Sequence, residues 1–133
     1  MWIFTKRFFC SVVSQNNNML VVRFRTYEHA KQFKKISGCE KIFKTYGRDY
    51  RYRVVIDKTK FAKIISNVIA DIDYFNFKDA VLTRGAGKNE MEAMYDVWLA
   101  MANLQSKSEL EMLAPLSGGR RNAIKEREEQ EDD

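Results

Sequence analysis

The stretch from residue 49 to residue 72 changes abruptly from a two-residue repeat to a helical repeat, and this change limits the possible folds more than any other feature. In residues 49–56 apolar and basic side chains alternate, which is the pattern of a strand with one buried face. Asp57 or Thr59 can cap a helix that follows directly. The apolar stripe of that helix consists of Phe61, Ile64, Ile65, Val68, Ile69 and Ile72. A strand joined to such a helix predicts a sheet with helices packed on it.

The other elements follow from the same reasoning. Further strands are expected over residues 2–5, 8–14 and 19–26, the first two forming a hairpin or one bent strand. Further helices are expected over residues 27–36, between Thr26 and Gly38, over residues 89–104, and more briefly over residues 108–113. Residues 39–48, with a possible short strand at Ile42 and Phe43, and residues 73–82, extended or a short helix, are ambiguous. The order predicts an α+β fold: a two-layer sandwich with a mainly antiparallel sheet of about four strands and two or three helices on one face.

At 133 residues the chain has the size of one domain, which is expected over residues 1–113. Residues 114–133 offer no apolar face and end in six acids among the last nine residues, which predicts a charged, flexible tail. Cys10 and Cys39 are expected to be free, mostly inert thiols, although a disulfide between them stays open. No apolar run approaches the roughly 18 residues of a membrane helix, so we expect a soluble, cytoplasmic protein without a membrane partner.

Charge is divided unevenly along the chain. Residues 1–63 hold 15 Lys and Arg against 4 Asp and Glu, whereas residues 64–133 hold 8 against 14. Such an asymmetry indicates one surface suited to an anionic partner and another with a different role. Nucleic acid is the commonest polyanion that meets a clustered basic surface.

Arginines alternate along two of the expected strands. If strands 19–26 and 49–56 share a sheet in matching register, Arg23, Arg25, Arg51 and Arg53 lie on one face, without acidic cross-strand partners, and Tyr50 and Tyr52 pack inward. Arginine offers a planar fork that binds phosphate or carboxylate through two hydrogen bonds. The alternative is an ordinary solvated sheet face. A helical stripe of Lys31, Lys34 and Lys35 adds further candidates for nucleic-acid binding.

Three other polar features are weaker candidates. Asp73, Asn76, Lys78 and Asp79 could do acid–base chemistry, but a buried, hydrogen-bonded turn is the favoured interpretation. His29, the single histidine, is expected at the surface. The segment Gly85-Ala86-Gly87-Lys88 does not match a phosphate loop, because Leu82 stands where the first glycine is needed and Asn89 replaces the Ser or Thr; a helix-entry loop is expected. We therefore expect no catalysis, no cofactor and no metal site.

The helix expected over residues 89–104 carries a methionine-rich stripe of Met91, Met94, Trp98 and Met101. Most of such a stripe is usually core, because methionine fills irregular gaps. The helix also has apolar residues on other sides, more than one sheet contact covers. Met94, Trp98 and Met101 are therefore candidates for contact with a protein partner or for self-association into a homo-oligomer.

Several short segments resemble a family of short, uncharacterised bacterial and phage proteins. The segments that carry the resemblance span residues 2–105: Trp2-Ile3-Phe4-Thr5, Phe8-Phe9-Cys10-Ser11-Val12-Val13, Asp49-Tyr50-Arg51-Tyr52-Arg53, Ile72-Asp73-Tyr74-Phe75-Asn76-Phe77-Lys78, and Val97-Trp98 through Leu104-Gln105. Lys6-Arg7 stands where the family tends to have a glycine turn, and the acidic tail is an addition. The family has no established activity, so the resemblance implies a bacterial or phage setting, with the host cytoplasm as the location of a phage protein.

These observations lead to two expectations about function. The first is a small non-enzymatic binding module whose basic sheet face binds nucleic acid or another polyanion. The alternative is a phage inhibitor of a host protein, a counter-defence factor that acts through its acidic carboxyl-terminal half and methionine-rich helix.

Overall fold

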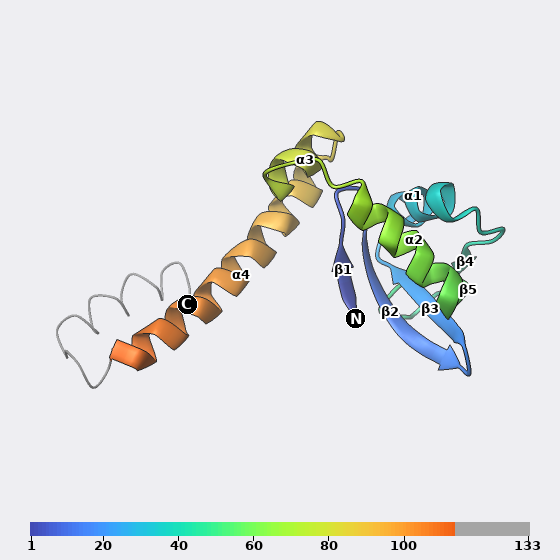
Figure 1. The fold of residues 1–133 in the computed structure, drawn as a ribbon, viewed down its shortest axis with the longest axis horizontal. Coiled ribbons are helices and arrows are strands. Elements are labelled where there is room, and N and C mark those ends of the chain that lie inside the picture. Colours follow the sequence, from blue (N-terminus) through green and yellow to red (C-terminus); the bar gives the residue numbers. More distant parts are fainter. Residues whose placement is uncertain (114–133) are drawn as a thin grey trace. The chain divides into compact units, whose positions relative to one another are not determined.

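The computed structural model describes residues 1–113, which belong to two compact units. The first unit, Met1–Arg84, holds the five strands and three of the four helices of the described chain, and the second begins at Gly85 and holds one long helix (Figure 1). The tail expected over residues 114–133 lies outside the described residues. The expectation of one domain over residues 1–113 stays a prediction.

The first unit is built on one antiparallel sheet. Its strands are β1 (Trp2–Phe4), β2 (Phe9–Asn16), β3 (Met19–Phe24), β4 (Phe43–Lys44) and β5 (Tyr52–Asp57), in the spatial order β1-β2-β3-β5-β4. Helices α1 (Tyr27–Ser37) and α2 (Lys58–Ala70) pack on one face of this sheet (Figure 1). The predicted α+β fold is confirmed, with five strands instead of about four.

Alternation along the strands places the core between the sheet and these two helices. Val22 and Val54, which are direct partners on β3 and β5, are both fully buried. The contiguous core consists of Phe8, Cys10, Val12, Val22, Phe24, Ala30, Phe33, Val54, Ile56, Phe61 and Ile64. Because successive strand side chains point to opposite faces, the residues between these positions form a second face that α1 and α2 do not cover.

Both helices on the sheet begin and end where their capping residues require. The Thr26 side chain accepts the backbone N–H of His29 at the start of α1, and Gly38 ends this helix with a left-handed φ of 69°. Asp57, rather than Thr59, caps α2 by accepting the N–H of Lys60 at 3.1 Å. Only the first part of the α2 stripe is buried: its last member, Ile72, lies beyond the helix and is 51% exposed.

The two ambiguous segments and the last helix are settled by the structure. Residues 39–48 contain only the two-residue strand β4, and α3 (Phe77–Thr83) occupies most of residues 73–82. Helix α4 runs without interruption from Lys88 to Leu113, so the expected break between residues 104 and 108 is wrong. Residues 105–107 contain neither Pro nor Gly, and nothing in them ends a helix. Gly85–Gly87 precede α4 as the expected entry loop.

Two side chains of the first unit that can ionise, His29 and Cys10, are buried. His29 is only 7% exposed, and its Nδ1 accepts the backbone N–H of Phe9 at 3.2 Å, which joins α1 to β2; its predicted surface position is wrong. Cys10 is completely buried, and burial raises the pKa of its thiol to about 12. Both Cys10 and Cys39 are free thiols, as expected.

Candidate nucleic-acid interface

A single row of side chains crosses all five strands on the uncovered face of the sheet. Its members are direct cross-strand partners, in the order Trp2, Ser11, Arg23, Arg53 and Phe43. The row lies on the face opposite to the buried Val22 and Val54, because it occupies the alternate strand positions. It brings together residues that are up to 51 positions apart in the sequence, from Trp2 to Arg53.

Arg23 and Arg25 lie over one aromatic ring at the centre of this face. The guanidinium carbons of Arg23 and Arg25 are 4.7 Å and 4.1 Å from the centre of the Tyr50 ring, which is the geometry of a cation–π contact. Arg23 also donates from Nη2 to Ser11 Oγ at 2.5 Å. Arg25 donates from Nη1 to Asp49 Oδ1 at 2.6 Å, and this pair raises the pKa of Arg25. Arg25 is therefore the arginine whose charge is already balanced.

Arg53 is a cation of this face that no carboxylate balances. Its Nε is shielded from solvent and has no hydrogen-bond acceptor. Burial, with Arg48 and Arg23 nearby, lowers the pKa of Arg53 from the usual arginine value. Among residues 1–113, neither Arg48 nor Arg53 forms an ion pair with an acidic side chain. The positive charges of Arg48 and Arg23 thus act on Arg53, which has no carboxylate partner, and this arrangement favours an incoming anion.

The predicted arginine face is confirmed in part. Strands β3 and β5 are neighbours and Arg23 lies directly opposite Arg53, which the alternation argument required. Arg25 does have an acidic partner, contrary to expectation, and Arg51 is an exposed residue just before β5, outside the paired register.

The inward orientation predicted for the two tyrosines holds only for Tyr52, which packs against the core. Tyr50 lies on the arginine face. The reason is a tight turn before β5, in which the N–H of Thr45 donates to the Arg51 carbonyl at 2.7 Å and Gly47 has a φ of 69°. Paired alternation begins at residue 52, so it does not extend back to residue 50.

The lysine stripe does not join this face. Lys31, Lys34 and Lys35 belong to α1, which packs on the opposite side of the sheet. Lys31 also forms an ion pair with Glu28 at 3.3 Å. The seven basic residues predicted to bind nucleic acid therefore occupy two separate layers.

The aromatic residues of the uncovered face were not recognised from the sequence. Phe4 and Phe9 are stacked with ring centres 4.5 Å apart, and Trp2 meets Phe9 edge-on at 6.1 Å. Trp2 remains 69% exposed, and Phe43 at the far end of the row is 43% exposed. The alternation of Trp2 and Phe4 around the core residue Ile3 was a usable signal, but their proximity to the arginines depends on the strand order.

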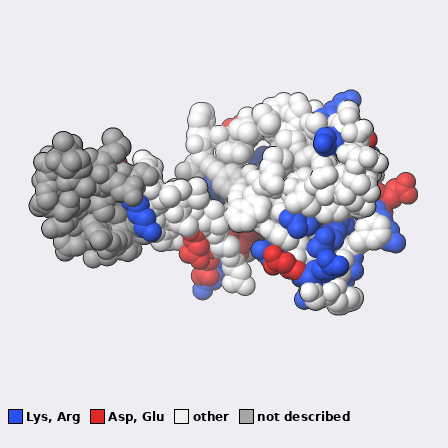
Figure 2. Space-filling view, turned by 90° about the horizontal axis from the view of Figure 1, so that it is seen from below, with Lys and Arg blue, Asp and Glu red and all other residues white. Residues whose placement is uncertain are grey.

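Basic side chains are concentrated on part of the first unit. In Figure 2, Lys and Arg side chains gather over the sheet-containing unit at the lower right, next to a smaller group of acidic atoms. Besides burial, the pKa of Arg53 is lowered by two neighbouring residues, Arg48 and Arg23, and both are cations. The surface around Arg53 is therefore locally positive.

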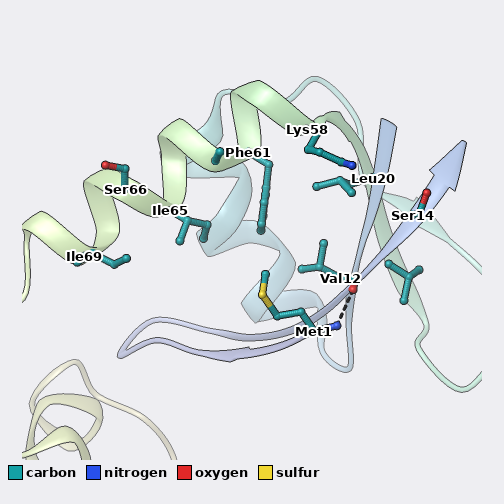
Figure 3. Close-up of a pocket in the computed structure, with 11 residues that line it drawn as sticks. Met1, Val12, Ser14, Leu20, Lys58, Phe61, Ile65, Ser66 and Ile69 are labelled. Atoms are coloured by element: carbon teal, nitrogen blue, oxygen red, sulfur yellow. Dashed lines mark hydrogen bonds between the residues drawn. The ribbon is translucent and has the colours of Figure 1, made fainter. Parts of the chain in front are cut away.

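An apolar pocket of about 560 Å³ lies on the other, helix-covered side (Figure 3). Its lining includes Val12, Leu20, Phe61 and Ile65, and the Met1 ammonium group at its rim donates to the Val12 carbonyl at 2.8 Å. No His, Cys, Asp or Glu lines this pocket. Apart from the Lys58 ammonium group, its described lining therefore offers none of the side chains that acid–base or metal chemistry commonly uses.

The polar cluster near residue 76 is not the buried turn that was expected. The Asp73 side chain is 82% exposed and lies 3.8 Å from the Lys6 ammonium nitrogen, and Asp79 is exposed as well. Asn76 accepts the N–H of Asp79 and caps α3, which explains its presence. In the described part of the chain, no group of three or more His, Cys, Asp and Glu side chains is placed to hold a metal ion.

The candidates for protein contact lie in the second unit. Met94 is 8% exposed, whereas Trp98 and Met101 are 52% and 60% exposed on α4. Tyr95 stacks on Trp98 with ring centres 5.8 Å apart. Trp98 and Met101 are therefore accessible to a partner, and Met94 is not.

Comparison with protein-family models, with curated proteins and with solved structures gave no match. The resemblance to short bacterial and phage proteins stays a prediction. No helix within residues 1–113 has the length and apolar character needed to cross a membrane.

Proposed function

We propose that this protein is a non-enzymatic binding module whose uncovered sheet face binds nucleic acid, in the bacterial or phage setting that the resemblance implies. The observation that carries the proposal is the group of Arg23, Arg48 and Arg53, in which Arg53 has neither a carboxylate partner nor an acceptor for Nε. Phosphate groups supply the missing negative charge and match the guanidinium fork.

Other charges of the first unit support a polyanion over a single small anion. Residues 1–84 hold 17 Lys and Arg against 7 Asp and Glu. Phosphate contacts of this kind provide affinity that falls with salt and carries little sequence information. On this face the Asp49 carboxylate is already paired with Arg25, and the cross-strand row contains no His or Cys, so binding is the function that its chemistry fits.

The experiment replaces two arginines by glutamine, Arg48→Gln and Arg53→Gln, and measures the binding of labelled oligonucleotides from about 50 to about 200 mM salt. We expect the double variant to bind at least tenfold more weakly than the unmodified protein at low salt. Its salt slope should also decrease by about 1 to 2, because up to two phosphate contacts are lost.

The chain offers a matched control on the other layer. Lys34→Gln with Lys35→Gln removes the same charge from α1, on the opposite side of the sheet. This variant should keep most of the affinity. If the lysine pair weakens binding as much as the arginine pair, affinity follows net charge alone and the sheet-face site is wrong.

A second candidate function rests on α4. Tyr95, Val97, Trp98, Met101 and Leu104 are each 40% or more exposed on this helix. Exposed apolar side chains in such number are typical of surfaces that contact another protein. The predicted role as a protein inhibitor, or self-association through this helix, would use them.

A further inference from the structure

The row across the uncovered face has an aromatic ring at each end and guanidinium groups between them. Trp2 on β1 and Phe43 on β4 are the ends, and Arg23 and Arg53 lie between them on β3 and β5. Neighbouring strands are about 4.8 Å apart, so four intervals extend the row over about 19 Å. In some RNA-binding proteins, two or three bases stack on aromatic side chains of a β-sheet.

The exposure of the two end rings distinguishes between kinds of nucleic acid. A duplex keeps its bases stacked inside the helix and presents mainly phosphates to a sheet. Its phosphates would engage the arginines and the Lys41 ammonium group, which lies 4.7 Å from the centre of the Phe43 ring, but no base would stack on Trp2 or Phe43. An unpaired strand presents the flat faces of its bases as well as its phosphates, and bases stack on aromatic side chains without regard to sequence.

The local packing also holds the Trp2 ring in place. Its edge-on contact with Phe9, which is itself stacked on Phe4, limits the motion of the indole while 69% of the residue remains exposed. A ring that is restrained and exposed loses little conformational freedom when a base stacks on it.

We propose that the partner of this face is single-stranded nucleic acid, DNA or RNA, whose unpaired bases stack on Trp2 and Phe43 while its backbone lies over Arg23 and Arg53. This inference rests on the proposed function and names the class of nucleic acid that the same face binds.

The test uses the fluorescence of Trp2 in the full-length chain. Because the chain has two tryptophans, Trp98→Phe leaves Trp2 as the single reporter. A single-stranded oligonucleotide should quench the Trp2 emission and should bind about tenfold more tightly than a duplex of the same sequence. An abasic strand of equal length and charge should bind more weakly and cause no quenching, because it keeps the phosphates but has no bases.

Substitution of the end rings gives an independent readout. Trp2→Ala and Phe43→Ala should each weaken single-strand binding about tenfold and leave the affinity for duplex unchanged. Phe75→Ala is the matched control, because Phe75 is a fully exposed aromatic residue of the same unit outside the sheet. It should change neither affinity.

The two proposals fail in different ways. Equal affinity for single strand, duplex and abasic strand, with no quenching of Trp2, would overturn base stacking and leave the arginine site intact. Absence of binding to every oligonucleotide at low salt would overturn the proposed function, and this inference with it.

Discussion

Arg53 lies at a position where folding alone would favour a different side chain. Its Nε is shielded without an acceptor, and the two charged residues that lower its pKa, Arg48 and Arg23, have the same sign. A buried polar group without a partner costs about 1 to 3 kcal/mol. Residues that reduce stability in this way are concentrated at functional sites, so this cost itself supports a binding role for Arg53.

The cost can be measured by replacing Arg53 with an unbranched apolar side chain of similar length. We expect Arg53→Met to raise the free energy of unfolding by about 1 kcal/mol, because it removes the unpaired Nε and the repulsion, while it weakens oligonucleotide binding. Urea denaturation measures the first effect. Arg51→Met, at an exposed position outside the paired strands, should leave stability unchanged. A less stable Arg53→Met variant would show that Arg53 contributes favourable contacts in the folded protein.

The junction of β5 and α2 shows how one residue serves two elements. Asp57 is the last residue of β5, paired with Met19, and its carboxylate caps α2 by accepting the N–H of Lys60. The chain passes from strand to helix without a loop between them. Arg53, on the uncovered face of the sheet, and α2, on the other face, therefore belong to one continuous segment of the chain without a loop between them.

Substitution of Asp57 and of Thr59 in turn distinguishes between the two residues that the sequence offered as the N-cap of α2. Asp57→Ala should lower the free energy of unfolding by about 1 kcal/mol, the typical cost of losing an N-cap side chain. Thr59→Ala, inside the first turn of α2, should change it by less than half of that amount. Thermal or urea unfolding followed by circular dichroism compares the two. A larger loss for Thr59→Ala would contradict the observed cap.

The two units of the chain differ in net charge as well as in secondary structure. The first unit has a net charge of +10, and the residues from Gly85 onward have a net charge of −5. The proposed nucleic-acid face lies wholly within the first unit, whereas the exposed apolar side chains of α4 lie in the second. The two candidate functions therefore depend on different parts of the chain.

Truncation tests this division. Residues 1–87 should unfold cooperatively and bind single-stranded oligonucleotides at least as tightly as the full chain, because they keep the core and lose only a net negative segment. Sedimentation of the two proteins shows whether residues 88–133 mediate self-association. If the fragment folds but does not bind, the sheet face alone is not sufficient for binding, and a role of α4 in partner recognition is favoured.

Local patterns were enough to predict most elements of the first unit. Thr26 and Gly38 delimit α1, and the period-two repeat in residues 19–26 and 49–56 corresponds to β3 and β5. These features depend on neighbours along the chain: side-chain capping, glycine's access to positive φ, and alternation of apolar residues. Such patterns also predicted one arginine face, provided that the two strands were adjacent.

The membership of the candidate site was decided by the tertiary structure. The row from Trp2 to Phe43 exists because five strands pair in one order and register, and no short stretch of sequence specifies that pairing. The turn at residues 45–51 placed Tyr50 beneath the arginines, and the packing of α1 on the opposite side of the sheet separated Lys31, Lys34 and Lys35 from them. The sequence by itself determined which segments are strands and helices, because those preferences are local. Which side chains meet on the binding face was decided by contacts between segments distant in the chain.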